Sequence, residues 1–173
     1  MPRNINTGIM QGRLLPKYNG RYQAHPLNYW KPEFMLAKSR SLDCIEFILD
    51  YENVEINPLI KENGIQEILD LVNSTGVSVK TVCADYFMEA PLHSENTVEA
   101  DLSASILRKL LQNVSKLGVT DIVIPCVDGS SLNTKESIVR FIKTLSPLLH
   151  KAEEYKVNLS LETDLAPEPF SEL

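Results

Sequence analysis

The sequence lacks three features that would set it apart from ordinary globular domains. No apolar run approaches the roughly 18 residues of a membrane-spanning helix, and Met1 to Asn4 lead into no apolar signal segment. No cluster of Lys and Arg offsets the formal net charge of -6, and phosphate backbones are bound through such clusters. We therefore expect a cytoplasmic protein with no membrane and no nucleic-acid partner.

Cysteine and glycine motifs are also scarce. The three cysteines, Cys44, Cys83 and Cys126, are far apart and show no CxxC spacing, so we predict reduced core thiols, with a three-thiolate metal site as the alternative. No GxGxxG follows a strand, and no GxxxxGK[ST] occurs. A dinucleotide site or a P-loop would need one of these phosphate cradles.

The apolar pattern that is present alternates between two periods. Stretches typical of strands alternate with stretches whose apolar residues recur every three or four positions, as in helices. This order predicts an α/β protein with a parallel sheet and right-handed crossovers. An open doubly wound sheet and a slice of a (β/α)8 TIM barrel both fit, and with 43% hydrophobic residues we expect a single domain over residues 1–173. Strands are expected near 8–10, 42–50, 77–85, 121–126 and 157–162, and helices over 32–42, 65–76, 98–117 and 133–152, the last opened by a capping box of Asn133 and Glu136.

Each predicted strand ends in polar residues. The clearest case is the run Val157 to Leu161, which alternates apolar and polar residues and then finishes in Glu162 and, two positions on, Asp164. Such carboxylates can hold a cation, although solvated loop residues or helix caps are the alternative. The other strand-end residues are Gln11 and Arg13, Glu46, Asp85 and Asp128. In the barrel interpretation they share the face where barrels place their sites.

Several candidates have equally specific structural alternatives. Glu46 interrupts an apolar strand, so it must be paired, bind a ligand or lie at the open end of the sheet. Arg13 offers a planar fork of donors for a hydroxyl or a phosphate, or it forms a salt bridge to Glu46. His93, downstream of Asp85, is either a ligand or a surface residue. Trp30 lies in a long aromatic loop, where we expect it to pack the loop down rather than stack on a ligand.

At this point the residues resemble a known family. The segments Gly8-Ile9-Met10-Gln11-Gly12-Arg13-Leu14, Asp43-Cys44-Ile45-Glu46, Val82-Cys83-Ala84-Asp85-Tyr86-Phe87-Met88 and Leu159-Ser160-Leu161-Glu162 resemble the sugar phosphate isomerase/epimerase proteins of the xylose-isomerase-like TIM-barrel superfamily. The resemblance covers the whole chain in the same order.

The resemblance implies a metal-dependent sugar or sugar-phosphate isomerase or epimerase that moves a proton next to a carbonyl. Glu162 matches the carboxylate at the end of strand five, which is a metal ligand and often an acid/base residue. Glu46 matches a polar position that contacts substrate or metal in some members. Gln11, Arg13, Asp85 and His93 are the further expected substrate contacts. The implied cofactor is a divalent metal, Mn or Mg, with Co or Zn as alternatives.

The chain also departs from the family. Full members close eight strands, and three more β/α units would need roughly another hundred residues. The family's other metal ligands, an Asp, a His and a second Glu, have no counterpart here. We therefore expect an incomplete barrel of about five β/α units, truncated from a longer one, which need not hold a metal by itself. Unpaired sheet edges favour a homo-oligomer. The alternatives are a catalytically inert assembly or binding module and, less favoured by the acidic charge, an endonuclease-like barrel.

Overall fold

The computed structural model describes residues 6–171 and 173, so the expectation about Met1 to Asn4 lies outside the described residues. The strands are β1 (Gly8–Met10), β2 (Cys44–Ile48), β3 (Ser78–Cys83), β4 (Asp121–Cys126) and β5 (Asn158–Thr163). The helices are α1 (Pro32–Ser39), α2 (Gly64–Thr75), α3 (Tyr86–Glu89), α4 (Thr97–Val114), α5 (Lys135–Tyr155) and α6 (Pro167–Ser171), and three 3-10 helices are η1 (Val54–Ile56), η2 (Ser115–Leu117) and η3 (Asp128–Ser130). Across these described ranges, no helix is both long enough and apolar enough to cross a membrane.

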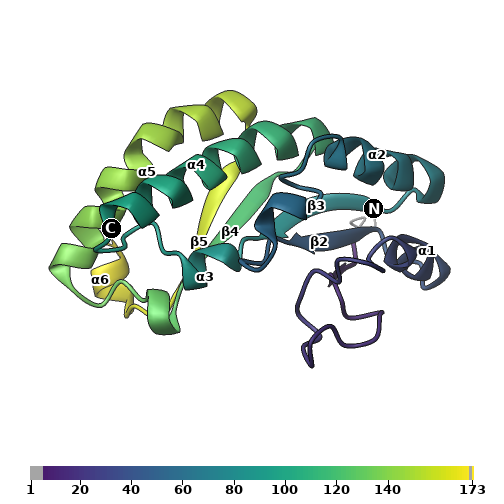
Figure 1. Cartoon of the computed structure of the whole chain (residues 1–173), viewed down its shortest axis with the longest axis horizontal. Coiled ribbons are helices and arrows are strands. Elements are labelled where there is room, and N and C mark those ends of the chain that lie inside the picture. Colours follow the sequence, from purple (N-terminus) through teal and green to yellow (C-terminus); the bar gives the residue numbers. More distant parts are fainter. Residues whose placement is uncertain (1–5, 172) are drawn as a thin grey trace, which may run out of the picture.

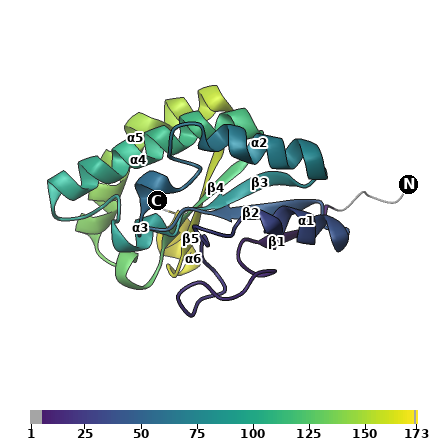
Figure 2. The same cartoon turned by 45° about the vertical axis from the view of Figure 1, so that its right-hand side comes forward.

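The five strands form one sheet in the order β1-β2-β3-β4-β5, and every neighbouring pair is parallel. A doubly wound sheet would reverse its strand order at a switch point, whereas this order runs in one direction only. The helices α2, α4 and α5 accordingly lie along one face of the sheet, and the described residues form no such layer on the opposite face (Figures 1 and 2). The prediction of a partial TIM-type barrel with five β/α units is confirmed.

The core lies between the sheet and this helical layer. Alternate strand residues such as Phe47, Val82 and Ile122 are fully buried there, and they pack with apolar residues of the helices, including Leu107 and Phe141. The alternation of a strand sends the residues between them to the opposite, concave face. The apolar residues that recur at helical spacing and those that alternate along the strands thus pack into one hydrophobic cluster.

The concave face carries polar side chains that bond to one another across the strands. Thr81 Oγ1 of β3 donates a 2.6 Å hydrogen bond to Glu46 Oε2 of β2. Asp121 Oδ1 of β4 accepts hydrogen bonds from Asn158 Nδ2 at 3.1 Å and Ser160 Oγ at 3.3 Å, both on β5.

One predicted helix start is wrong. The capping box at the start of α5 is not formed by Asn133 and Glu136. Thr134 is the N-cap, its side chain accepts a hydrogen bond from the Ser137 N–H, and the Ser137 hydroxyl bonds back to the Thr134 N–H. Thr134 and Ser137 form the same kind of capping box as Asn133 and Glu136 could form, but one position later along the chain. The sequence pattern therefore pointed to the neighbouring residue.

The long loop between β1 and α1 is held by buried acceptors. Glu33 of α1 has no exposed surface, and its carboxylate accepts hydrogen bonds from the backbone N–H groups of Gly12 at 2.9 Å and Leu14 at 3.1 Å. Burial raises the pKa of Glu33, and these two hydrogen bonds act against that rise. Trp30 packs against Phe34 and Phe47, as expected for an aromatic residue that fixes the loop.

A second anchor joins the loop to the strand ends. Gln11 is 1% exposed, and its Oε1 accepts a 3.0 Å hydrogen bond from the Ile48 N–H. The same oxygen lies 3.1 Å from His25 Nδ1, so that nitrogen carries the proton. His25 is 2% exposed, and its Nε2 has no partner within the described residues. Burial, and to a smaller degree the charge of Lys61, lowers the pKa of His25 to about 3.

We predict that Glu33→Ala destabilises the protein by about 1–3 kcal/mol, because two buried N–H groups lose their acceptor. Glu33→Gln keeps one acceptor oxygen and should cost less. Urea unfolding followed by circular dichroism measures both changes. Glu62→Ala, at an exposed position, is the control for removal of a carboxylate, and an equal effect at Glu33 and Glu62 would contradict the anchoring role.

His25 makes stability depend on pH. The pKa of His25 is 6.5 in the unfolded chain and about 3 in the native state. Between these two pH values the unfolded chain binds a proton that the native state does not bind. The free energy of unfolding therefore falls as the pH falls from 6.5 toward 3. The slope approaches about 1.4 kcal/mol per pH unit. Unfolding free energies measured at pH 7, 6 and 5 should therefore converge between the wild type and His25→Gln. His150→Gln, at a side chain that is 93% exposed, is the control for removal of an imidazole, and an equal effect of both substitutions would contradict the role of His25.

Candidate functional site

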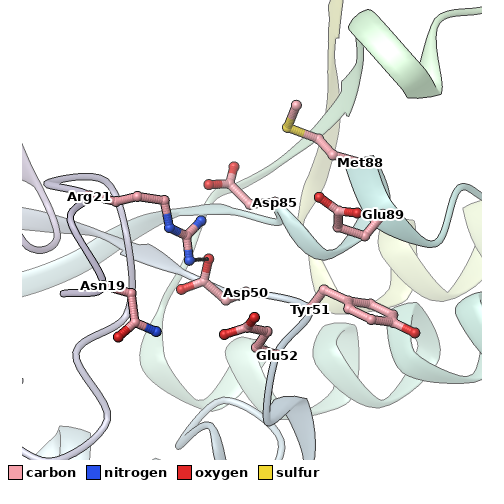
Figure 3. Close-up of a pocket in the computed structure, with 8 residues that line it drawn as sticks. All are labelled: Asn19, Arg21, Asp50, Tyr51, Glu52, Asp85, Met88 and Glu89. Carbon is pink, nitrogen blue, oxygen red and sulfur yellow. Dashed lines mark ion pairs between the residues drawn. The ribbon is translucent and has the colours of Figure 1, made fainter.

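The carboxyl ends of β2 and β3 and the β1–α1 loop enclose a pocket of about 610 Å³. Figure 3 shows Arg21 reaching from the loop toward Asp50, which follows β2, with Asp85 and Glu89 on the side of β3 and α3. Because parallel strands end at one edge of the sheet, residues far apart in sequence meet there. The residues that line the pocket are Asn19, Arg21, Asp50, Tyr51, Glu52, Asp85, Met88 and Glu89.

Asp50 is the buried acid of this pocket. It is 7% exposed, its Oδ2 accepts a 2.6 Å hydrogen bond from the His25 N–H, and its Oδ1 lies 3.3 Å from Arg21 Nη2. Burial raises the pKa of Asp50, while the His25 N–H and the Arg21 charge lower it and Asp85 raises it. The loop therefore brings a donor and a cation to a carboxylate that the fold has removed from water.

Asp85 is the predicted site residue that the structure places in the pocket. Its Oδ2 accepts a 3.3 Å hydrogen bond from Gln23 Nε2 of the loop, and its Oδ1 lies 3.0 Å from Cys83 Sγ, which donates to it. Asp85 is only half buried, so its carboxylate still has lone pairs for a ligand. A hydroxyl donor is the natural partner for an oxygen in this position.

Glu162 lies on the concave face of β5. Leu159 and Leu161 pack against the core, so the alternation of the strand turns Glu162 to the opposite side, where it is exposed. Burial is the largest cause of the raised pKa of the Cys83 thiol, and the charges of Asp85, Glu46 and Glu162 raise it further.

Glu46 occupies a smaller hollow on the same concave face. The hollow measures about 260 Å³ and is also lined by Met10, Cys44 and Thr81. The sequence predicts that Glu46 is paired, binds a ligand or lies at the open end of the sheet. In the structure its carboxylate is paired with the Thr81 hydroxyl. The described ion pairs include none between Arg13 and Glu46.

The other sequence candidates lie away from the pocket. Gln11 is buried, and both contacts of its Oε1 are with the protein. Arg13 is exposed and does not line the pocket. His93 is 7% exposed and packs against Phe141 of α5, with ring centroids 6.2 Å apart. Burial lowers the pKa of His93, and the Arg140 charge adds to this effect.

Sequence reasoning missed the residues that line most of the pocket. Asp50 follows its strand as directly as Asp85 follows the next one, so the strand-end rule that selected Asp85 would have selected Asp50 as well. Arg21 carried no local signal. Its position depends on the path of the loop, which is set by contacts with Glu33 and Asp50 from other elements.

The described residues do not fit a complete metal site. No group of three or more His, Cys, Asp or Glu side chains in residues 6–171 and 173 is placed to hold an ion. Glu162 is a single exposed carboxylate, and Asp164, two residues on, accepts a hydrogen bond from Ser131 Oγ at 2.7 Å. Hard divalent cations need several oxygen ligands together, and the described residues bring no such group together around Glu162.

No protein-family model matches the chain, and no curated protein matches it in sequence. Solved structures do match it in fold. The apo form of 3-keto-D-glucoside 4-epimerase YcjR from E. coli superposes with a TM-score of 0.65 at 15% identity, over 91% of this chain and 56% of that one. D-psicose 3-epimerase with D-tagatose, from Clostridium cellulolyticum H10, gives 0.67 at 16% identity, over 91% and 52%.

A third structure, a xylose isomerase domain protein from Planctomyces limnophilus, gives a TM-score of 0.62 at 11% identity, over 96% of this chain and 57% of that one. The chain thus spans about half the length of the proteins it resembles. At these identities the likeness concerns the fold. The chain shares the fold of these proteins over the part of them that it spans.

Proposed function

We propose that the chain carries part of a sugar isomerase or epimerase site, with the pocket between the β1–α1 loop and β3 as its sugar-binding portion. The observation that supports this most is the gathering of Asp50, Asp85 and Glu162 at one end of a parallel sheet. Solved proteins with this fold are sugar epimerases by their names. In barrels of this type, reactive groups lie at the carboxyl ends of the strands.

In this proposal Asp85 accepts a hydrogen bond from a sugar hydroxyl, and Glu162 is the proton acceptor. A carboxylate next to a carbonyl-bearing sugar can take a proton from the carbon beside that carbonyl, and a carboxylate then returns a proton to complete the change. Glu162 is exposed on the concave face, and the proposal requires the reacting end of the substrate to extend from the pocket to this face. Contacts to sugar from Gln11, Arg13, Glu46 and His93 stay predictions.

A divalent metal would need ligands from outside the described residues. The resemblance implies Mn or Mg, with Co or Zn as alternatives, and a bound cation would stabilise negative charge on the substrate oxygens. Because Glu162 stands as a single ligand, we assign it the proton-transfer role in this chain. The site becomes catalytically complete only with further residues.

The second candidate is a catalytically inert partial barrel that acts as an assembly or binding module. It is favoured by the absence of any group of three or more potential metal ligands in the described part of the chain. Both candidates allow sugar binding in the pocket, and they differ in whether Glu162 takes part in chemistry. A homo-oligomer stays a prediction under either.

Asp85→Asn should weaken binding of D-fructose about tenfold, because a hydrogen bond to a charged acceptor exceeds one to a neutral acceptor by about 1–1.5 kcal/mol. NMR titration of backbone amide signals measures the dissociation constant and shows which residues respond. Asp70→Asn, at an exposed position of α2, is the matched control. If Asp85→Asn and Asp70→Asn bind D-fructose equally well, Asp85 does not contact the sugar. Arg13→Ala, in the same titration, tests the predicted contact of Arg13.

Metal titration separates the two roles of Glu162. We expect isothermal titration calorimetry with Mn²⁺ to detect no micromolar site in this chain, because a lone carboxylate binds hard cations weakly. Glu162→Gln should leave the titration unchanged. Micromolar binding that disappears in Glu162→Gln would instead mean that the chain assembles a metal site by itself, and would contradict the assignment of proton transfer alone.

A further inference from the structure

The charge in the pocket between the β1–α1 loop and β3 is strongly one-sided. Of the described residues that line it, Arg21 is the sole cation, and it faces four carboxylates, so three negative charges stay uncompensated when all five groups are ionised. Glu52 and Glu89 are exposed at its rim. A ligand that enters this pocket meets a negative potential before it makes any contact.

Arg21 is already paired with a carboxylate of the protein. Its guanidinium lies 3.3 Å from Asp50 Oδ1, and Asp50 is 7% exposed. If Arg21 turned fully toward a phosphate, Asp50 would lose its only charged partner among the described residues, and leaving such a charge unpaired is costly. The charge of Arg21 is therefore already offset by Asp50 before a ligand arrives.

The usual devices for phosphate binding are also missing from the described lining. Proteins hold phosphate with Arg forks, with Lys, or with the N-terminus of a helix. The helix that begins at this pocket, α3, has four residues and is preceded by Asp85, an acid. Lysine does not line the pocket.

The lining suits an uncharged ligand with many hydroxyl groups. Carboxylates accept hydrogen bonds from hydroxyls, and about 610 Å³ lies within the range of small-molecule pockets. Tyr51 is 49% exposed and packs against Tyr86, with ring centroids 5.3 Å apart. Its free surface offers an apolar wall for the C–H groups of a sugar.

We propose that this pocket binds the hydroxyl-bearing part of a free sugar and rejects the phosphate ester of the same sugar by charge repulsion. The inference rests on the proposed function, since it names the substrate class of the same site. A site can discriminate against the phosphate ester if the negative charge of the phosphate meets other negative charges. Glu52 and Glu89 supply these charges at the rim.

The test compares D-fructose with D-fructose 6-phosphate by NMR titration at low ionic strength. We expect the ester to bind at least about tenfold more weakly than the sugar, and added salt to narrow the difference because it screens exposed charges. In Glu52→Gln/Glu89→Gln the difference should fall below about threefold, since two repelling charges are gone. The amide signals of Tyr51 and Glu89 report that binding occurs in this pocket.

The matched control is Glu136→Gln/Glu153→Gln, which changes the net charge equally at exposed positions of α5. The control should keep the wild-type difference between the two ligands. Equal or tighter binding of the ester would overturn the inference and leave the proposed sugar site standing. Binding of neither ligand would overturn both. A difference that persists in Glu52→Gln/Glu89→Gln, or that shrinks as much in the control, would show that the rim carboxylates are not its cause.

Discussion

The parallel, sequential order of the five strands is the constraint on which the rest of the structure depends. A right-handed crossover returns the chain to the same end of the sheet each time, so the helices gather on one face and the strand ends on one rim (Figure 1). Asp50 and Asp85 follow two different strands and line one pocket without any local sequence relationship. The same order leaves a concave face without a helical layer.

That concave face carries polar contacts between neighbouring strands. A closed barrel fills its interior with bulky branched residues, whereas here Glu46 pairs with Thr81, and Asp121 pairs with Asn158 and Ser160. The apolar surface is instead at the side of the sheet, where α5, β5 and α6 enclose a hollow of about 200 Å³. Ile142, Leu149 and Phe170 are each more than 40% exposed there. Further β/α units would cover this side in a complete barrel.

The sequence predicted what depends on period and on strand ends. All five strands, the parallel sheet and the position of Asp85 follow from local alternation and from the rule that polar residues terminate buried strands. The burial of Gln11 and the capture of Arg21 by Asp50 could not be predicted in this way, because both depend on how a loop of about twenty residues folds back over the sheet. The helix cap at Thr134 shows the same limit at short range, since two adjacent residues offered equivalent chemistry.

Asp50 connects the stability of the loop to the properties of the pocket. Its burial raises the cost of its charge, and the His25 N–H and the Arg21 guanidinium offset that cost. Asp50 therefore holds the loop against the sheet, and the loop in turn supplies the two groups that stabilise the buried charge of Asp50. Arg21 is the one cation among the described residues that line the pocket, and Asp50 offsets its charge. The other carboxylates of the lining therefore keep a negative potential. By pairing with Arg21, Asp50 therefore leaves the pocket suited to ligands without negative charge.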